Sequence, residues 1–336
     1  TEVVFGEDEV KDYCANIDWS RYWVIGHNLS GFDSMILAWR LGIKPKLWGC
    51  TLAMARPIHA KNVGGSLARL VTHYKIGFKD NTALHKTKGR HLKDFTAEEV
   101  EGMRVYNKED VDQCYELFTR LIPQTKKSEV RLIDITIRAL VEPHFECDMD
   151  LLNNTLVEES IRKKALLVDA AIKMDELGMD DDEAAEAVLK LLSSAPKFAQ
   201  FLRTLGVDVP TKVSPRTGKD IPALAKTDED FIALQEHENP LVATAAHARL
   251  DAKSTPLQTR IVAFLAAANA HPEKKVPIPL KYYGADTTGR WSGWAYNPQN
   301  LPRINPYSPK PSDALRKSLV APKGYKVVVA GLSGIE

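Results

Sequence analysis

The spacing of the apolar residues changes twice along the chain, and each change marks a different folding pattern. Over roughly the first 120 residues, short apolar runs alternate with helical periodicity, which is typical of an α/β domain. A mostly helical stretch follows and ends near Asn269, broken at 206–224 by residues rich in Gly, Pro, Thr and Lys. Proline-rich loops then lead to a last apolar run. We therefore expect three parts, at 1–125, 126–270 and 271–336.

Five local elements are predicted from periodicity and capping residues. The run Trp23–Gly26 predicts a short buried strand, and Phe32–Leu41 has helical spacing, with Phe32, Ile36 and Arg40 on successive turns. A helix is expected from Thr96 to Phe118, and an apolar strand at Tyr325–Ala330. A long helix is expected to begin at an N-cap, Asp150. Its predicted buried stripe consists of Leu152, Leu156, Ile161, Ala165, Val168 and Ile172.

Composition and charge narrow the classes of protein. Of the 336 residues, 44% are apolar and 26% charged, the four cysteines form no CxxC pair, and no apolar run is long enough to span a membrane. We therefore expect a protein of the cytoplasm, with no zinc site or disulfide framework. The net charge of +1 hides a basic stretch, 253–326, with 12 Lys and Arg against 3 Asp and Glu. Such a stretch suits a phosphate backbone, or alternatively a solvated basic surface.

The first candidate site combines His27-Asn28-Leu29-Ser30-Gly31-Phe32-Asp33 with Tyr106-Asn107-Lys108-Glu109-Asp110. Asp33 follows a predicted strand, and Tyr106 and Asp110 are four apart, so they share one face of a helix. A phosphodiester hydrolase with two metal ions needs convergent carboxylates and a group that orients water. Asp33 and Asp110 are candidate ligands and catalytic residues, with Tyr106 as the orienting hydroxyl. Each half alone is more often a surface pair or a helix cap.

Together and in this order, the two halves resemble the second and third motifs of the DEDD 3′→5′ exonucleases, of the subtype with a tyrosine. The segments Cys50-Thr51-Leu52-Ala53-Met54-Ala55-Arg56 and Gly65-Ser66-Leu67 are similar to phage members. The resemblance implies single-stranded 3′ ends as substrate and Mg²⁺ (or Mn²⁺) as cofactor. The first motif of that family, Asp-x-Glu on the first strand, does not occur here. The resemblance therefore predicts half of a two-metal site.

The second candidate site is a polar loop region after residue 284. Ala285–Gly293 and Asn297–Arg303 hold arginines, side-chain amides, hydroxyls and two glycines, Gly289 and Gly293. Arginine offers forked donors to phosphate, amides reach base edges in the minor groove, and glycines allow close turns. On general grounds the same residues also suit a hydrogen-bonded surface loop.

The order of motifs favours nucleic acid. Thr-Gly-Arg, then Asn-x-Gln-Asn-x-Pro-Arg, Leu315-Arg316, Ala321-Pro322-x-Gly324 and the final Leu332–Glu336 resemble the palm of phage-type family A DNA polymerases. Thr211–Ser214, Thr217–Lys219 and Ala225–Asp228 resemble the phage versions, and Arg249 with Lys253-Ser254-Thr255 is similar to their thumb motif. The resemblance implies that Glu336 lies near the sugar of the incoming nucleotide. It implies DNA contacts for Lys253, Ser254, Thr288, Arg290, Gln299, Asn300 and Arg316.

Here too the chain departs from the family. The palm strand of the family ends in a metal-binding Asp, whereas this chain has Gly331 there, so we expect no polymerisation by this piece alone. The resemblance implies an α/β exonuclease domain (ribonuclease H-like), a mainly α-helical thumb and the first part of an α+β palm. It implies primer–template DNA and dNTPs as partners of the parent enzyme.

The sequence leaves three hypotheses open. The chain is a truncated piece of a phage replicative polymerase with proofreading exonuclease, which the start at Thr1 and the end at Glu336 favour. Alternatively it is one half of a split polymerase, completed by a second chain that supplies the fingers and the rest of the palm. The third hypothesis is a decayed relative that binds primer–template DNA without catalysis, which Gly331 and the absent first motif favour.

Overall fold

The computed structural model describes residues 6–79, 82–173, 180–251, 256–301 and 309–329. Contacts divide the chain into two compact units. The first comprises Thr1–Cys147, Ala263–Leu301 and Leu319–Glu336, and the second comprises Asp148–Val262 and Pro302–Ser318. The expected boundaries at 125 and 270 separate functional parts, and they stay predictions.

The first unit contains a parallel pair of strands, β1 (Trp23–Gly26) and β2 (Leu47–Cys50). Their register runs from Trp23 opposite Leu47 to Gly26 opposite Cys50. The strand predicted at 23–26 is therefore present, but it is not buried as expected, since Trp23 is 48% exposed and the three following residues are half-buried. A parallel pair needs a crossover segment, and here it contains the turn that carries Asp33.

The α-helix expected at Phe32–Leu41 is wrong in length. Only Asp33–Met35 (α2) is α-helical, and Ile36–Arg40 (η3) forms a π-helical turn. Phe32 and Ile36, which were expected on successive turns of this helix, are 63% and 36% exposed. The core is instead contacted by Met35, Leu37, Ala38 and Leu41. Of these, Leu37 and Ala38 belong to the π-helical turn.

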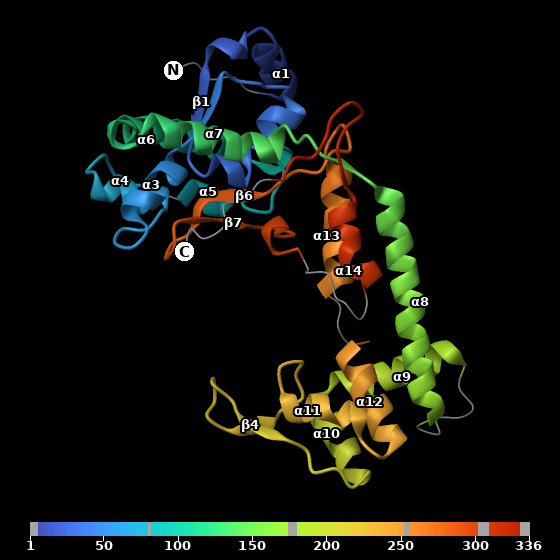
Figure 1. Cartoon of the computed structure of the whole chain (residues 1–336). Helices are drawn as coiled ribbons and strands as arrows, with labels where there is room; N and C mark the ends of the chain where they lie inside the picture. Colours follow the sequence, from blue (N-terminus) through green and yellow to red (C-terminus); the bar gives the residue numbers. More distant parts are fainter. Residues whose placement is uncertain (1–5, 80–81, 174–179, 252–255, 302–308, 330–336) are drawn as a thin grey trace. The chain divides into compact units, whose positions relative to one another are not determined.

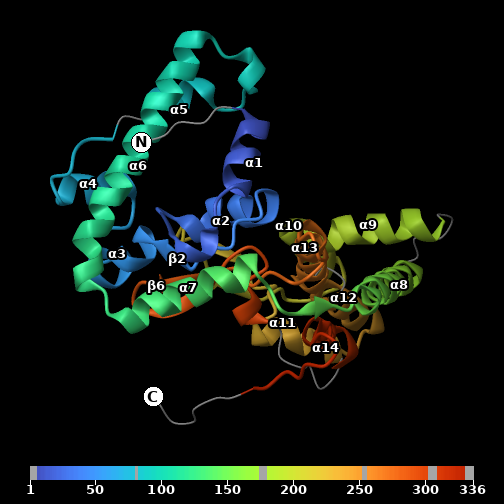
Figure 2. The ribbon, with the colours of Figure 1, turned by 90° about the horizontal axis from the view of Figure 1, so that it is seen from above.

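Helix α6 (Ala97–Leu121) confirms the helix predicted from Thr96 to Phe118. The Thr96 side chain accepts from the Glu99 backbone N–H, and the Glu99 carboxylate accepts from the Thr96 backbone N–H, which is a capping box. The chain turns sharply at Ile122–Gln124 into α7 (Lys127–Val141), as Figure 2 shows. The buried residues of α7 pack against β2 and complete the core of this unit.

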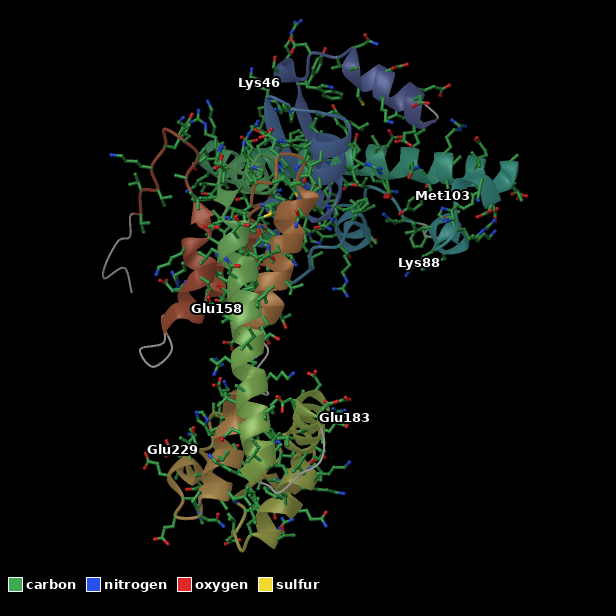
Figure 3. All side chains as sticks on the ribbon, turned by 90° about the vertical axis from the view of Figure 1, so that its right-hand side faces the viewer. Lys46, Lys88, Met103, Glu158, Glu183 and Glu229 are labelled. Carbon is green, nitrogen blue, oxygen red and sulfur yellow. The ribbon has the colours of Figure 1, made fainter. Side chains whose placement is uncertain are left out.

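Shorter helices complete the N-terminal part. They are α1 (Glu7–Ala15), α3 (Thr51–His59), α4 (Leu67–His73) and α5 (Thr82–Thr87). Helix α5 lies along α6; in Figure 3, Lys88 marks the end of α5 and Met103 its neighbour on α6.

Two antiparallel strand pairs bring the C-terminal residues into the first unit. The hairpin of β6 (Leu280–Ala285) and β7 (Arg290–Gly293) packs against α3 and α7 (Figure 1). β3 (Glu146–Cys147) pairs with β8 (Leu319–Val320). The strand predicted at Tyr325–Ala330 is wrong for residues 325–329, which pair with no strand among the described residues; Ala330 lies outside them. Val328 and Val329 are 86% and 90% exposed, because an apolar run becomes a buried strand only with a neighbour to pair with.

The second unit is built on the long helix α8 (Met149–Lys173). Its N-terminus is capped by Asp148, not by the expected Asp150, because the Asp148 carboxylate accepts from the Leu151 backbone N–H at 2.9 Å. The predicted stripe is partly wrong, since Ile161 and Ile172 are 64% and 61% exposed and Ala165 is exposed as well. The buried residues are Leu152, Thr155, Glu159, Lys163, Leu167, Ala170 and Ala171.

The middle of that buried face is charged. Arg162 donates to both oxygens of Glu159 and to both oxygens of Asp251, and Lys163 donates to Gln258 at 2.8 Å. The hydrogen bonds to the two carboxylates raise the pKa of Arg162 further above its ordinary value. A periodicity of apolar residues misses such a helix, because buried charges are stabilised only by partners elsewhere in the chain.

The helices between residues 180 and 251 gather around one end of α8, as Figure 1 shows. The segment predicted to break the helices is confirmed as a hairpin, β4 (Thr211–Val213) with β5 (Asp220–Pro222). The core centres on Phe198 and Phe231, whose rings meet edge to face. Besides α8, the helices of this unit are α9 (Asp181–Ser193), α10 (Ala195–Thr204), α11 (Glu229–Ala233), α12 (Pro240–Asp251), α13 (Pro256–Ala270, shared with the first unit) and α14 (Pro309–Lys317).

The described residues are thus mainly helical, with small two-stranded sheets. None of their helices combines the length and the apolar character that a membrane crossing requires.

Candidate functional site

Asp33 is presented by a tight turn after β1. Asn28 adopts the left-handed conformation (φ 60°), and its carbonyl accepts from the Gly31 N–H at 2.8 Å. Helix α2 then begins at Asp33, whose side chain reaches solvent. The protein packed beside its carboxyl still removes hydration, and this desolvation raises the pKa of Asp33.

Tyr106, Asp110 and Cys114 follow one another at intervals of four on the inner side of α6. Tyr106 and Asp110 are half-buried, and Cys114 is buried. The pKa of Cys114 is raised by burial and also by the charges of Asp110 and Asp33. Both predicted carboxylates therefore lie within electrostatic reach of the same thiol. That the two motifs, some 70 residues apart in sequence, form one site stays a prediction.

Lys79 is the residue of this site that the sequence analysis missed. Its ammonium donates to Asp110 Oδ2 at 2.8 Å and lies 5.1 Å from the centroid of the Tyr106 ring. Burial lowers the pKa of Lys79, but the interactions with Asp110 and Tyr106 outweigh burial and raise it. No spacing signal could have found Lys79, because it lies in a loop 31 residues before its partner.

His27 is the second missed residue, although it immediately precedes Asn28. Its Nε2 donates to the Gly65 carbonyl at 3.0 Å, and its Nδ1 lies 2.9 Å from the Thr51 hydroxyl. Burial lowers the pKa of His27 to about 4, so the ring is neutral at pH 7. A neutral ring that donates through Nε2 accepts from Thr51 at Nδ1. His27 therefore fixes the turn before Asp33 rather than binding an anion.

The described residues do not fit a two-metal site. Asp33 and Asp110 are the two predicted ligands, but the described part of the chain holds no group of three or more His, Cys, Asp or Glu side chains that suits a metal ion. One oxygen of Asp110 already accepts from Lys79. A pair of divalent ions needs more oxygen ligands than these.

The second candidate site is the turn and loop of the β6–β7 hairpin. Thr288 and Arg290 are exposed at the turn. Gly289 has φ +68°, and a Cβ there would lie 2.7 Å from the Tyr283 ring. A Cβ on Gly293 would lie 2.3 Å from Asn297 Oδ1. The two glycines thus allow the close turns that the sequence predicted.

The hairpin is fixed to the helices of the same unit. Tyr282 donates its hydroxyl to Glu129, and Trp291 Nε1 donates to Thr136 at 2.9 Å. Arg56 on α3 donates to the Tyr282 carbonyl at 3.0 Å. Arg290 is thereby exposed on a support that is anchored on three sides.

The loop after β7 contains strained and unsatisfied residues. Ala295 and Asn297 have positive φ values of 54° and 48°. The buried Tyr296 hydroxyl and Asn297 Oδ1 have no hydrogen-bond partner among the described residues. Gln299 and Asn300 follow on the short turn Pro298–Asn300 and are exposed.

Of the remaining residues assigned by resemblance to DNA or nucleotide contacts, Arg316 alone lies among the described residues. Arg316 is exposed on α14, in the second unit. Lys253, Ser254, Gly331 and Glu336 lie outside the described residues.

Arg249 corrects the thumb motif. It is only 5% exposed, its guanidinium donates to the carbonyls of Leu192 and Leu224, and it lies 4.9 Å from the Phe198 ring centroid. A phosphate backbone outside the unit cannot reach a guanidinium that is held by core carbonyls.

A cavity of about 390 Å³ in the first unit was not anticipated. Trp39, Lys44, Glu142, His271 and Lys275 are among its lining residues, and the rings of Trp39 and His271 meet edge to face at 5.3 Å. No residue assigned from the sequence lines it.

Comparison with known proteins gives one kind of match. No protein-family model matches the chain, and no curated protein sequence does. Among solved structures, the fold is similar to the POL domain of Pol1 from M. smegmatis, in complex with DNA primer-template and dNTP, with a TM-score of 0.56 and 17% identity. The alignment covers 95% of this chain and 48% of that one, so this chain spans about half the length of the solved structure. At this identity, the likeness shows a polymerase-like fold.

Proposed function

We propose that the chain is the primer–template-binding part of a family A DNA polymerase, with an exonuclease-type domain at 1–125, a thumb at 126–270 and the start of the palm at 271–336. The observation that carries the proposal is the fold similarity over 95% of the chain to a polymerase domain that is bound, in that structure, to DNA primer-template and dNTP. The exposed hairpin residues Thr288 and Arg290 support it, because they stand on an anchored turn in a basic stretch.

In this function the hairpin and its loop hold the DNA, with Thr288, Arg290, Gln299 and Asn300 as the contacts in the first unit. Arg316, Lys253 and Ser254 are assigned by resemblance to further DNA contacts, and Glu336 to the incoming nucleotide. Polymerisation and 3′→5′ proofreading during phage replication are activities of the whole polymerase. Divalent metal ions would there need ligands beyond Asp33 and Asp110.

A second candidate is a DNA-binding piece without catalysis of its own, completed by another chain or not at all. The Lys79–Asp110 ion pair favours it, because the ammonium occupies an oxygen that a metal ion would use. Gly331 points the same way.

A binding and cleavage experiment tests both candidates. The chain is titrated against a fluorescent primer–template with a recessed 3′ end and against a blunt duplex of the same length, at several salt concentrations. We expect tighter binding of the primer–template, with an affinity that falls as salt rises. Equal affinity for both substrates, or no binding at low salt, contradicts the proposal.

The same samples with Mg²⁺ or Mn²⁺ measure shortening of the single-stranded 3′ end. Shortening that Asp33→Asn abolishes assigns exonuclease activity to this chain. Binding without shortening supports the second candidate.

A further inference from the structure

We propose that Phe78 and Lys79 form a binding element for single-stranded DNA that works without a divalent metal ion. The inference rests on the proposed function, since it assumes that the face of α6 around Asp110 meets a DNA strand. It starts from a conflict within this face, which resembles a metal site in sequence but is occupied by a lysine.

The Phe78-Lys79 segment is held against α6 at two points. The Gln113 amide donates to the Phe78 carbonyl at 3.0 Å, and Lys79 donates to Asp110 at 2.8 Å. Asp110 and Gln113 are three apart, so they lie on neighbouring turns of one helix face. A segment fixed in this way loses little conformational freedom when a ligand binds.

The ring of Phe78 is not used by the fold. It is 80% exposed, while the backbone that carries it is pinned. Phe32 is 63% exposed and lies next to Asp33, the other acid that acts on Cys114. Exposed aromatic rings on a fixed support are platforms for unstacked bases. A duplex hides the faces of its bases, so this feature selects a single strand.

Lys79 supplies the charge that such a strand needs. An ammonium has three N–H donors, so a hydrogen bond to Asp110 leaves donors for a phosphate oxygen. Asp33 and Asp110 alone would repel a phosphate. Lys79 offsets the charge of Asp110 directly, through the hydrogen bond at 2.8 Å. The local charge thus permits a DNA backbone without added Mg²⁺.

The test uses the full chain and a labelled oligo-dT of about ten nucleotides, a length that one such groove can hold, in buffer with EDTA. Lys79→Met removes the ammonium and keeps the apolar stem, and Phe78→Ala removes the ring. We expect each variant to bind about tenfold more weakly. Lys79→Met should also reduce the slope of log affinity against log salt by about 0.7. Lys79→Arg should restore most of the affinity.

Two matched controls isolate the element. Lys108→Met removes a lysine of α6 that is likewise paired with a carboxylate, Asp112 at 2.5 Å. Tyr22→Ala removes another exposed ring of the first unit, 54% exposed. Both should bind like the unaltered chain, within about twofold. Circular dichroism confirms that all variants are folded.

The outcomes separate the inference from the function. If the unaltered chain binds primer–template but Lys79→Met and Phe78→Ala bind the single strand in EDTA as well as it does, the inference is wrong and the proposed function stands. If Lys79→Met keeps its affinity and gains Mg²⁺-dependent shortening of the strand, Lys79 covers a metal ligand instead. If the chain binds neither DNA, the proposed function itself fails.

Discussion

The β6–β7 hairpin of the first unit and the helical core of the second each hold an arginine that lies in a motif resembling those of family A DNA polymerases. Arg290 stands exposed at the hairpin turn, whereas Arg249 is 5% exposed and bound to main-chain carbonyls. The same residue type, in a motif of the same family, therefore has two different roles. One guanidinium is open to solvent, and the other uses its donors inside the fold.

The two arginines differ in whether their guanidinium groups find hydrogen-bond acceptors inside the fold. A buried guanidinium is tolerated only when acceptors satisfy it, and Leu192 and Leu224 supply them to Arg249. Burial lowers the pKa of Arg249, but arginine keeps its proton in proteins, so its charge must be accommodated at every pH. In the hairpin, Glu129 and Thr136 accept hydrogen bonds from the two aromatic side chains, and the arginine stays in solvent.

Arg249→Met should have the largest effect. The change leaves two core carbonyls without their donor and removes the contact with the Phe198 ring. We expect a loss of about 3 kcal/mol in the free energy of unfolding, measured by urea titration with circular dichroism.

Arg203→Met is the matched control, because it removes an exposed arginine of α10 in the same unit. It should change the free energy of unfolding by less than about 0.5 kcal/mol. If Arg249→Met is as stable as the unaltered chain but binds primer–template more weakly, Arg249 contacts DNA and the contrast with Arg290 is wrong.

His27 shows what a buried cationic group does when it can lose its proton. Its pKa is about 4 in the folded chain because of burial, against the ordinary 6.5. Below pH 6.5 the unfolded chain binds a proton that the folded chain refuses until about pH 4. The stability is therefore complete above pH 6.5 and falls as the pH drops toward 4, by about 2 kcal/mol after allowance for partial solvent access.

His27→Gln keeps a donor for the Gly65 carbonyl and removes the titration. The difference in stability between the two proteins should change between pH 6.5 and 4 and stay level outside that range. The stability lost in Arg249→Met should instead be the same at pH 4 as at pH 6.5. An imidazole that titrates near 6.5 by NMR would contradict the burial of His27.

The sequence predicted elements whose signal is local. The strand at Trp23–Gly26, the capped helix from Thr96 and the Gly-rich break at 206–224 each depend on neighbouring residues, and all three are present. Tyr106 and Asp110 could be paired with Asp33 because a known motif order supplied the long-range link.

What failed depends on partners far away in the chain. Ile161 was expected inside because it is apolar, but Glu159 and Lys163 take the buried face of α8, where Arg162, Asp251 and Gln258 satisfy their charges. Lys79 belongs to no periodic pattern and to no motif, and only the tertiary structure places it beside Asp110. Burial and pairing of charges are properties of the tertiary structure, so they cannot be read from spacing.

Gly289→Ala tests the support of the exposed arginine. Gly289 has φ +68°, and a Cβ would meet the Tyr283 ring at 2.7 Å. We expect a loss of between about 1 and 2 kcal/mol in the free energy of unfolding, from the left-handed conformation and the contact together.

Gly218→Ala is the control, because Gly218 has φ +65° in the β4–β5 turn and open space around it. It should lose only the backbone part, about 1 kcal/mol. The two proteins should also differ in DNA affinity, with weaker primer–template binding by Gly289→Ala. Equal effects would mean that the turn next to Arg290 is no more constrained than a turn in the second unit.

Arg290→Met should have the smallest effect, and it should fall on binding alone. The guanidinium is exposed, so its loss should leave the free energy of unfolding unchanged within about 0.5 kcal/mol. One lost phosphate contact on a duplex should weaken primer–template binding about fivefold and reduce the salt slope by about 0.9. Arg21→Met, at an exposed arginine on the short turn Trp19–Arg21, should change neither quantity.

The hairpin and the core are then opposites in a measurable sense: Arg249→Met lowers stability with DNA affinity intact, and Arg290→Met lowers DNA affinity with stability intact. If Arg290→Met keeps both its affinity for primer–template and its salt slope, the hairpin is a surface loop and the exposed arginine does not contact DNA.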